Sequence, residues 1–346
     1  MAYFDVIVVG GGHAGVEAAC ASARKNVSVC LLTSKKDTIG QMSCNPAIGG
    51  LGKGHLVREI DALDGVMARA IDASGIHFKM LNQSKGPAVQ GPRAQADRKI
   101  YSKEIIKHIS SYENIKVVEN TVKRIIIKKH LVTGLECINS LIINCKSIIL
   151  TTGTFLGGII HLGKSQTPAG RINEPAVNGL TENFKSLGLK IGRLKTGTPP
   201  RILTSKINWS GLEIQSGDAI PTPFSFITKE IVQKQIDCAI TRTTEATHDL
   251  IEKSIKLSPV YSGSIKSSGP RYCPSIEDKV FKFSDRKSHQ IFLEPEGLDS
   301  PLVYPNGIST ALPKEIQVEM LKTIPGLEKA EISQFGYAIE YDFVDP

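Results

Sequence analysis

The chain has 346 residues, of which 41% are hydrophobic, so it can bury the core of one large domain or of two smaller ones. It contains no run of 18 apolar residues, which argues against a membrane span, and its formal net charge of +8 is compatible with a nucleic-acid partner. Seven cysteines without a CxxC pair or zinc-ligand spacing predict reduced thiols, no metal site and a cytoplasmic protein.

The first elements of the chain predict a βαβ unit. Residues 3–9 are a short apolar run typical of a buried parallel strand, residues 16–23 predict a helix of small residues, and residues 27–32 predict a second strand. Between them, residues 10–15 read Gly-Gly-Gly-His-Ala-Gly, a GxGxxG pattern. Such glycines permit a tight turn, let the backbone approach a pyrophosphate and allow close helix–strand packing. We therefore expect a dinucleotide site rather than an ordinary glycine turn, with His13 as a turn residue and not a catalytic base.

The second strand ends without an acidic residue. Residues 31–34 read Leu-Leu-Thr-Ser, whereas an NAD site of the usual kind has an Asp or Glu here that binds the ribose hydroxyls. This difference argues against a plain NAD dehydrogenase.

A second glycine-rich segment, residues 44–55, precedes a predicted helix at residues 56–63. It does not match the Walker pattern, because no Gly-Lys-Ser/Thr sequence closes it. A flexible backbone at a helix start can pack against a flat ring or a phosphate. Its thiol, Cys44, is either part of a site or a small buried residue, and the spacing leaves both interpretations open.

The next region predicts a helix followed by short strands. Polar residues 85–101 lead into a predicted helix at residues 94–110, and they either line a site or form a solvated loop. Short hairpins inserted before a later core strand favour a flavin-binding fold over a minimal Rossmann domain. The predicted strands cover residues 115–119, 122–128, 131–138, 141–144 and 147–151.

The second half of the chain has weaker local signals. Residues 192–201 predict a basic, turn-rich connection, and the Ser/Thr-rich residues 204–268 predict an inserted subdomain. Residues 293–313 predict loops because they contain several Pro and Gly. A helix is predicted at residues 313–324 and an alternating strand at residues 336–343.

Residues 269–283 form the most informative stretch of the sequence. Cys273 lies between a tyrosine and a proline and is surrounded by basic and acidic residues, unlike a structural cysteine in an apolar run. A thiol near fixed positive charge loses its proton more easily, and the thiolate is the nucleophile. The stretch consists of Gly269, Pro270, Arg271, Tyr272, Cys273, Pro274, Ser275, Ile276, Glu277, Asp278, Lys279, Val280, Phe281, Lys282 and Phe283.

Together these stretches resemble one family, the FAD-dependent tRNA uridine 5-carboxymethylaminomethyl modification enzymes known as MnmG or GidA. The resemblance runs over all 346 residues. Residues 269–283 are highly specific for the family, whereas the glycine turn is shared by many flavoproteins. The matching segments are residues 10–15, 40–50, 85–89, 93–101, 195–201, 269–283 and 304–310.

The resemblance implies a fold and a reaction. The fold is α/β: an FAD-binding, doubly wound Rossmann-like domain with a β-rich hairpin insert and a second inserted α/β subdomain associated with NADH. We expect the first part of the FAD-binding domain at residues 1–203, the insert at 204–268 and a return to the first domain at 269–346. Such enzymes act as homodimers together with the GTPase MnmE, and they are not bound to a membrane. They add an aminomethyl-type group to C5 of the wobble uridine of certain tRNAs, with methylenetetrahydrofolate as the one-carbon donor.

The resemblance also assigns roles to individual residues. Residues 269–283 correspond to a nucleotide-binding segment, and Cys44 and Cys273 match the two cysteines implicated in catalysis. C5 of uracil is a poor nucleophile, but addition of a thiolate to C6 creates an enolate that attacks an electrophilic carbon. We expect Cys273 to be that nucleophile, because charged residues surround it, and Cys44 either to assist or to take the nucleophilic role instead. The expected FAD contacts are Gly10, Gly11, Gly12, His13, Ala14, Gly15 and Val122.

The sequence departs from the family pattern in two ways. Gln90 stands where the pattern predicts an arginine. Family members also continue past Pro346 into a second flavin-contacting segment and a helical region that binds tRNA and the GTPase. We therefore expect a truncated chain that retains FAD weakly or not at all. The alternatives are a folate- and FAD-dependent tRNA uridine methyltransferase, which we do not expect to carry residues 269–283, and a catalytically inactive remnant.

Overall fold

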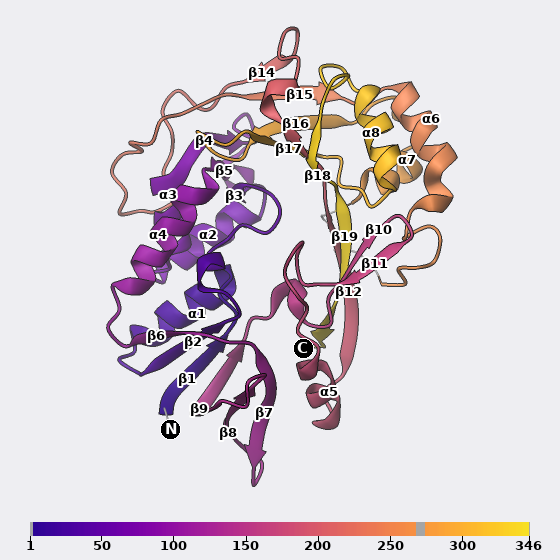
Figure 1. Ribbon diagram of the computed structural model, residues 1–346. Helices are drawn as coiled ribbons and strands as arrows, with labels where there is room; N and C mark the ends of the chain where they lie inside the picture. The colour runs from indigo at the N-terminus through magenta and orange to yellow at the C-terminus, as the bar shows by residue number, and fades with distance from the viewer. Residues whose placement is uncertain (1–2, 268–273, 346) are drawn as a thin grey trace.

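A six-stranded mixed sheet forms the N-terminal half of the protein. The computed structural model describes residues 3–267 and 274–345 (Figure 1). The strand order is β6–β2–β1–β9–β8–β7; the first four strands are parallel, and the last two are antiparallel to their neighbours. The strands are β1 (Tyr3–Val9), β2 (Val29–Thr33), β6 (Ile115–Glu119), β7 (Val122–Lys128), β8 (Leu131–Cys137) and β9 (Ile142–Leu150). This topology confirms the predicted Rossmann-like fold with a β-hairpin insert.

Both faces of this sheet are covered, as the continuous apolar runs of β1 and β2 require. Alternate residues point to opposite faces, so that Val8 and Leu31 belong to one hydrophobic cluster and Ile7 and Leu32 to another. Helices α1 (His13–Ala23) and α4 (Arg98–Ser110) cover the first face. Helix α5 (Gly179–Ser186) packs against the second.

A small sheet with two helices extends the N-terminal half. The sheet has the order β3–β5–β4, and helices α2 and α3 lie beside it (Figure 1). These elements are β3 (Ala47–Gly49), β4 (Gly75–Leu81), β5 (Gly91–Ala96), α2 (Lys53–Ala62) and α3 (Met67–Ser74), with 3-10 turns η1 (Lys36–Thr38) and η2 (Pro87–Val89).

Two further sheets form the other half of the ribbon (Figure 1). One has the order β11–β10–β19–β12, and the other has the order β14–β15–β16–β17–β13–β18. The strands are β10 (Ile159–Leu162), β11 (Ser165–Pro168), β12 (Ile191–Thr198), β13 (Arg201–Leu203), β14 (Glu213–Gln215), β15 (Cys238–Arg242), β16 (Gln290–Pro295), β17 (Leu302–Asn306), β18 (Ile332–Gln334) and β19 (Tyr337–Val344). The helices are α6 (Glu245–Ser254), α7 (Ile276–Lys282) and α8 (Lys314–Lys322), with 3-10 turns η3 (Gly153–Phe155), η4 (Thr204–Lys206) and η5 (Ile255–Leu257).

Several element predictions were wrong where distant pairing overrides local propensity. The helix predicted to start at residue 94 starts at Arg98, because strand β5 occupies the preceding residues and Asp97 caps the helix by accepting hydrogen bonds from Lys99 N and Ile100 N. The two strands predicted at 141–151 are the single strand β9. The predicted turn at 192–201 contains β12, and the predicted loop at 293–313 contains β17 and the end of β16.

Residues 204–268 do not form a sheet of their own. Their strands β14 and β15 pair with each other, and β15 pairs with β16, which lies beyond residue 268. The same sheet also contains β13, which precedes residue 204. The division into domains at 204 and 269 therefore stays a prediction, since one hydrogen-bonded sheet crosses both boundaries.

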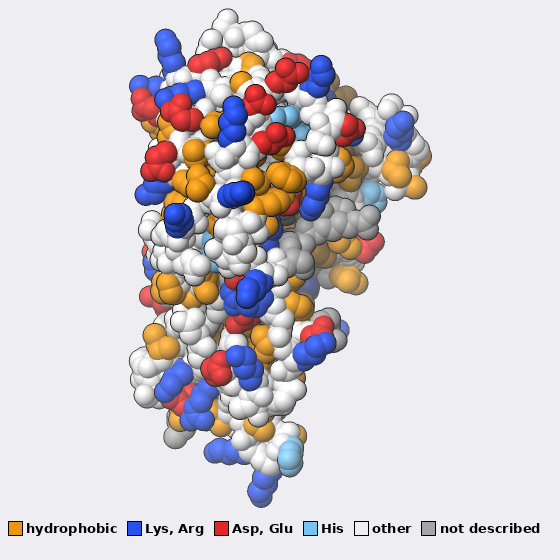
Figure 2. Space-filling view, turned by 90° about the vertical axis from the view of Figure 1, so that its right-hand side faces the viewer, with side chains coloured by type: hydrophobic (Ala, Val, Ile, Leu, Met, Phe, Trp, Pro, Cys, Tyr) orange, Lys and Arg blue, Asp and Glu red, His pale blue; other side chains and the backbone are white. Residues whose placement is uncertain are grey.

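Charge alone does not mark a partner site on the face shown in Figure 2. On the face shown in Figure 2, Lys and Arg side chains are spread along the whole height of the molecule with acidic side chains among them. The net positive charge is therefore not gathered in one patch on that face. In the part of the chain that the structure describes, no helix is long and apolar enough to cross a lipid bilayer.

Candidate functional site

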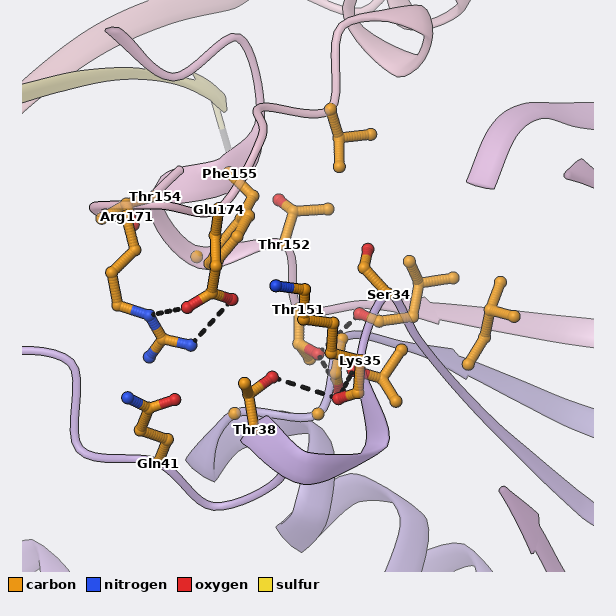
Figure 3. A pocket seen from close by; sticks show the side chains of 18 of the residues that line it. Ser34, Lys35, Thr38, Gln41, Thr151, Thr152, Thr154, Phe155, Arg171 and Glu174 are labelled. Atoms are coloured by element: carbon orange, nitrogen blue, oxygen red, sulfur yellow. Dashed lines mark hydrogen bonds and ion pairs between the residues drawn. The ribbon is translucent and has the colours of Figure 1, made fainter. Parts of the chain in front are cut away.

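A cavity lies at the carboxyl ends of β1, β2 and β9, the position where open α/β sheets bind ligands (Figure 3). Its volume is about 220 Å³, whereas an ordered water needs only about 10–15 Å³. The cavity therefore has room for a ligand much larger than water. It is lined by Val9, Gly10, Gly11, Gly12, Leu32, Thr33, Ser34, Lys35, Thr38, Gln41, Ser43, Asn120, Val122, Thr151, Thr152, Gly153, Thr154, Phe155, Arg171, Glu174 and Val177.

The glycines of the first turn have different structural roles. A Cβ on Gly15 would lie 1.8 Å from the carbonyl oxygen of Gly10, and a Cβ on Gly10 would lie 2.4 Å from that of Thr151. Gly10 also has a φ of +112°, which L side chains rarely adopt. A Cβ on Gly12, in contrast, would meet no described atom within 4 Å. Gly15 therefore allows helix α1 to pack closely against Gly10, and Gly10 allows the turn to pack closely against Thr151. Gly12 keeps part of the cavity wall open.

The first turn of helix α1 offers hydrogen-bond donors beside the cavity. The helix begins at His13, and its N-cap, Gly12, has no side chain that accepts a bond from the first turn. The first N–H groups of a helix lack intrahelical partners and carry partial positive charge, so they favour an anionic ligand. His13, Ala14 and Gly15 do not line the cavity themselves. The His13 ring packs 5.5 Å from the ring of Tyr101, and desolvation lowers the pKa of His13.

The end of β2 lines the cavity with Thr33, Ser34 and Lys35 instead of a carboxylate. The Thr121 hydroxyl donates to Ser34 Oγ at 3.0 Å. Among the described residues that line the cavity, Glu174 is the only acid, and it forms a two-point ion pair with Arg171 at 2.6 and 3.0 Å. The ribose of a dinucleotide would therefore meet hydroxyl and ammonium groups at this strand end.

Cys44 follows directly after a residue of the cavity wall. Ser43 lines the cavity and accepts a hydrogen bond from Arg171 at 3.2 Å, and Cys44 is the next residue. The half-buried sulfur of Cys44 lies 3.0 Å from the hydroxyl of Tyr304 and 3.5 Å from the carbonyl oxygen of Gly197. The predicted thiol is therefore held by residues from β12 and β17, adjacent in sequence to the cavity wall.

Two arginines hold the backbone of Cys44. Its carbonyl oxygen accepts hydrogen bonds from Arg98 and Arg201, the latter at 3.2 Å. The same arginines pair with Glu296, at 2.9 and 2.8 Å. Arg201 also stacks over the Tyr304 ring at 4.7 Å. One buried network of two cations and one carboxylate therefore surrounds Cys44.

The second predicted site segment is only partly within the described residues. Gly269, Pro270, Arg271, Tyr272 and Cys273 lie outside them. Residues 274–283 form the start and body of helix α7, where Ser275 and Asp278 make a reciprocal capping box. None of these ten residues lines the large cavity.

Helix α7 nevertheless lies close to the strand that contacts Cys44. Ser275 and Glu277 line a second cavity of about 10 Å³, room for about one water, together with Gly197 of β12. Glu277 is buried, which raises its pKa, and it accepts a hydrogen bond from the Thr310 hydroxyl at 3.0 Å. Cys44 and the start of α7 therefore approach the same residue, Gly197.

Sequence reasoning assigned no role to three groups that surround Cys44. Tyr304, Arg98 and Arg201 lie within segments 304–310, 93–101 and 195–201, which carried the family resemblance. The family match of these segments was the only sign in the sequence that the three residues matter. No local sequence pattern indicates that residues so far apart in the chain contact Cys44. Among the described residues there is also no cluster of three or more His, Cys, Asp or Glu side chains that could hold a metal ion.

Comparison with known protein families shows which family this chain belongs to. A family model described as Glucose inhibited division protein A matches residues 5–346. The chain belongs to this family, GidA. Relatives from Granulibacter bethesdensis and Thermodesulfovibrio yellowstonii, both named tRNA uridine 5-carboxymethylaminomethyl modification enzyme MnmG, are 53% and 54% identical to it. They match 100% and 99% of the chain but only 55% of their own lengths, so the chain spans about half the length of these curated relatives.

Solved GidA structures confirm the predicted fold. GidA from Aquifex aeolicus, in its form I and form II crystals, superposes with TM-scores of 0.94 and 0.92 and is 49% and 47% identical. Each comparison covers 99% of this chain and 58% or 56% of the Aquifex chain. The predicted family resemblance is thus confirmed in sequence and in fold.

Proposed function

We propose that this chain provides the flavin site and both catalytic thiols, Cys44 and Cys273, of a tRNA-modifying enzyme. The reaction adds a carboxymethylaminomethyl or aminomethyl group to C5 of the wobble uridine, with methylenetetrahydrofolate as the one-carbon donor, glycine or ammonium as the respective nitrogen donor, and FAD and NADH for the redox step. It takes place in the cytoplasm, in a homodimer that works with the GTPase MnmE. The observation that supports this best is that Ser43 lines the glycine-turn cavity while the next residue, Cys44, has its sulfur fixed by Tyr304.

The residues around the cavity fit FAD. The open wall at Gly12 and the donors of the first turn of α1 suit its pyrophosphate. Ser34, Lys35 and Val122 would line the adenosine side, and Ser43 lies toward the thiol. When bound, FAD supplies redox chemistry with NADH and a carrier for the one-carbon unit.

The protein's own residues supply the covalent step on the base. A cysteine thiolate adds to C6 of uracil and makes C5 nucleophilic, so that C5 forms a bond to the electrophilic carbon. Removal of the C5 proton by a base then expels the thiolate and restores the uracil ring. We assign the addition to Cys273 and the removal of the C5 proton to Cys44, whose sulfur is held by hydrogen bonds with the Tyr304 hydroxyl and the Gly197 carbonyl oxygen.

Replacing Cys44 by alanine is expected to lower wobble-uridine modification by about 10²- to 10⁴-fold, the usual loss when a group that transfers a proton is removed. FAD affinity should change little, because Cys44 does not line the cavity. The measurement is mass spectrometry of tRNA nucleosides from a strain that lacks its own GidA-family enzyme and expresses the variant, with FAD titration of the purified protein.

The matched control is Cys137→Ala, a buried thiol of the β7–β8 hairpin, which should leave modification unchanged. Full modification by the Cys44→Ala variant would overturn the role of this thiol. If the unsubstituted chain bound no FAD and modified no tRNA, the proposed function of the chain would be wrong.

A further inference from the structure

We propose that Tyr304 is a positioning residue for Cys44: its hydroxyl fixes the sulfur and stabilises the thiolate by donating a hydrogen bond to it. The inference rests on the proposed function, because that function makes Cys44 a catalytic thiol. Its test needs neither tRNA nor flavin. It concerns a residue that touches the reactive thiol and not the substrate.

We assign the Tyr304 hydroxyl as the donor to sulfur, because the thiol proton has its own acceptor in the Gly197 carbonyl oxygen. Tyr304 lies on β17 with only 3% of its surface exposed, and its Oη is 3.0 Å from Cys44 Sγ. A buried phenolic hydroxyl normally has a hydrogen-bond partner, and within the described residues the sulfur is the partner found for this one. Burial also raises the pKa of Tyr304 well above its usual value, so the phenol keeps its proton at neutral pH.

Cys44 has a second hydrogen-bond partner, the carbonyl oxygen of Gly197, which can bind only the protonated thiol. The carbonyl oxygen of Gly197, at 3.5 Å, accepts the S–H proton while Tyr304 donates to the sulfur. After the proton leaves, the bond to Gly197 is lost and the bond from Tyr304 becomes charge-assisted. Hydrogen bonds to an ionised group are roughly twice as strong as neutral ones, so the hydroxyl favours the thiolate.

The surrounding charged residues hold the Tyr304 ring and Cys44 in fixed positions relative to each other. Arg201 stacks over the Tyr304 ring at 4.7 Å and donates to the Cys44 carbonyl at 3.2 Å, so one guanidinium contacts both residues. Opposite Tyr304 in the β16–β17 pair is Glu294, which binds Arg93 at 2.7 Å. The titratable and charged groups that interact with Cys44 are therefore Tyr304, Tyr337, Arg98 and Arg201. Glu296 pairs with both arginines, and Glu294 and Arg171 lie one contact further out, near Tyr304 and Tyr337.

The test compares Tyr304→Phe with the unsubstituted chain. The substitution keeps the ring and removes only the hydroxyl. The rate of Cys44 alkylation by iodoacetamide is measured between pH 6 and pH 10, with the modified peptide quantified by mass spectrometry, so the other cysteines do not interfere. Without the donor, Cys44 alkylation at pH 7 is expected to slow by about tenfold, and the rates should converge at high pH.

The control is Tyr112→Phe, which removes a hydroxyl that accepts a bond from Arg24, remote in sequence from Cys44. The pH dependence of Cys44 alkylation in this control variant should match that of the unsubstituted chain. If Tyr304→Phe fails to fold, fluorotyrosine at position 304 preserves the shape and makes the hydroxyl a stronger donor, so the profile should move to lower pH. Unchanged profiles in the folded Tyr304 variants would overturn the proposal. Since alkylation needs neither tRNA nor flavin, this outcome is distinguishable from a failure of the proposed function.

Discussion

Replacing Gly15 by alanine is expected to destabilise the protein by about 3 kcal/mol or more and to abolish FAD binding. The added Cβ would lie 1.8 Å from the carbonyl oxygen of Gly10 and 2.8 Å from Thr151 Oγ1. Backbone cannot yield as a flexible side chain does, so helix α1 would have to move away from the turn. That movement would displace the first-turn donors from the cavity. Urea denaturation measures the loss of stability, and FAD titration measures binding.

Gly12→Ala is the matched variant at the same turn. Its Cβ would meet no described atom within 4 Å, and the backbone angles of Gly12, φ −75° and ψ −174°, suit any L residue. We expect stability within about 0.5 kcal/mol of the unsubstituted chain, as for a substitution that meets no neighbour. Because the methyl group would project into open space beside the cavity, FAD affinity should fall about tenfold or more. Equal stability of both variants would contradict the structural role of Gly15.

Replacing Arg201 by methionine is expected to cost about 1–3 kcal/mol of stability, because it removes a nearly buried donor from acceptors that have little access to water. Arg201 is only 5% exposed and donates to Glu296 at 2.8 Å and to Thr198 Oγ1 at 2.6 Å. Without it, Glu296 keeps only Arg98, and the Cys44 carbonyl loses one of two donors. Urea denaturation gives the stability, and Cys44 alkylation reports the disturbance at the thiol.

Lys206→Met is the control for this prediction. Lys206 pairs with Glu331 at 2.6 Å, but both side chains are about half exposed. Exposed pairs contribute about 0–1 kcal/mol, so this variant should unfold near the midpoint of the unsubstituted chain. Arg201→Lys should recover only part of the loss, since an ammonium cannot reproduce the planar set of guanidinium donors. A loss below about 1 kcal/mol for Arg201→Met would refute the buried-pair argument.

The part of the site built by neighbouring residues could be predicted from the sequence. The first strand, the glycine turn and the following helix are encoded within about 20 residues, because apolar runs and glycine spacing act locally. The absence of an acid at the end of the second strand was also visible, and the structure has Thr33, Ser34 and Lys35 there. The hairpin of β7 and β8 was predicted for the same reason, since its strands are adjacent in sequence.

Only the tertiary structure decided what surrounds Cys44. Its thiol contacts Tyr304, 260 residues away, and its backbone contacts Arg98 and Arg201. Strands β12 and β17 were predicted as a turn and a loop, because their Gly and Pro residues suggest breaks when partners are unknown. Pairing with β19 and β16 supplies hydrogen bonds that outweigh those local preferences. Thus the sequence alone determined the dinucleotide turn through local spacing, whereas the partners of the thiol depend on long-range pairing that no local pattern encodes.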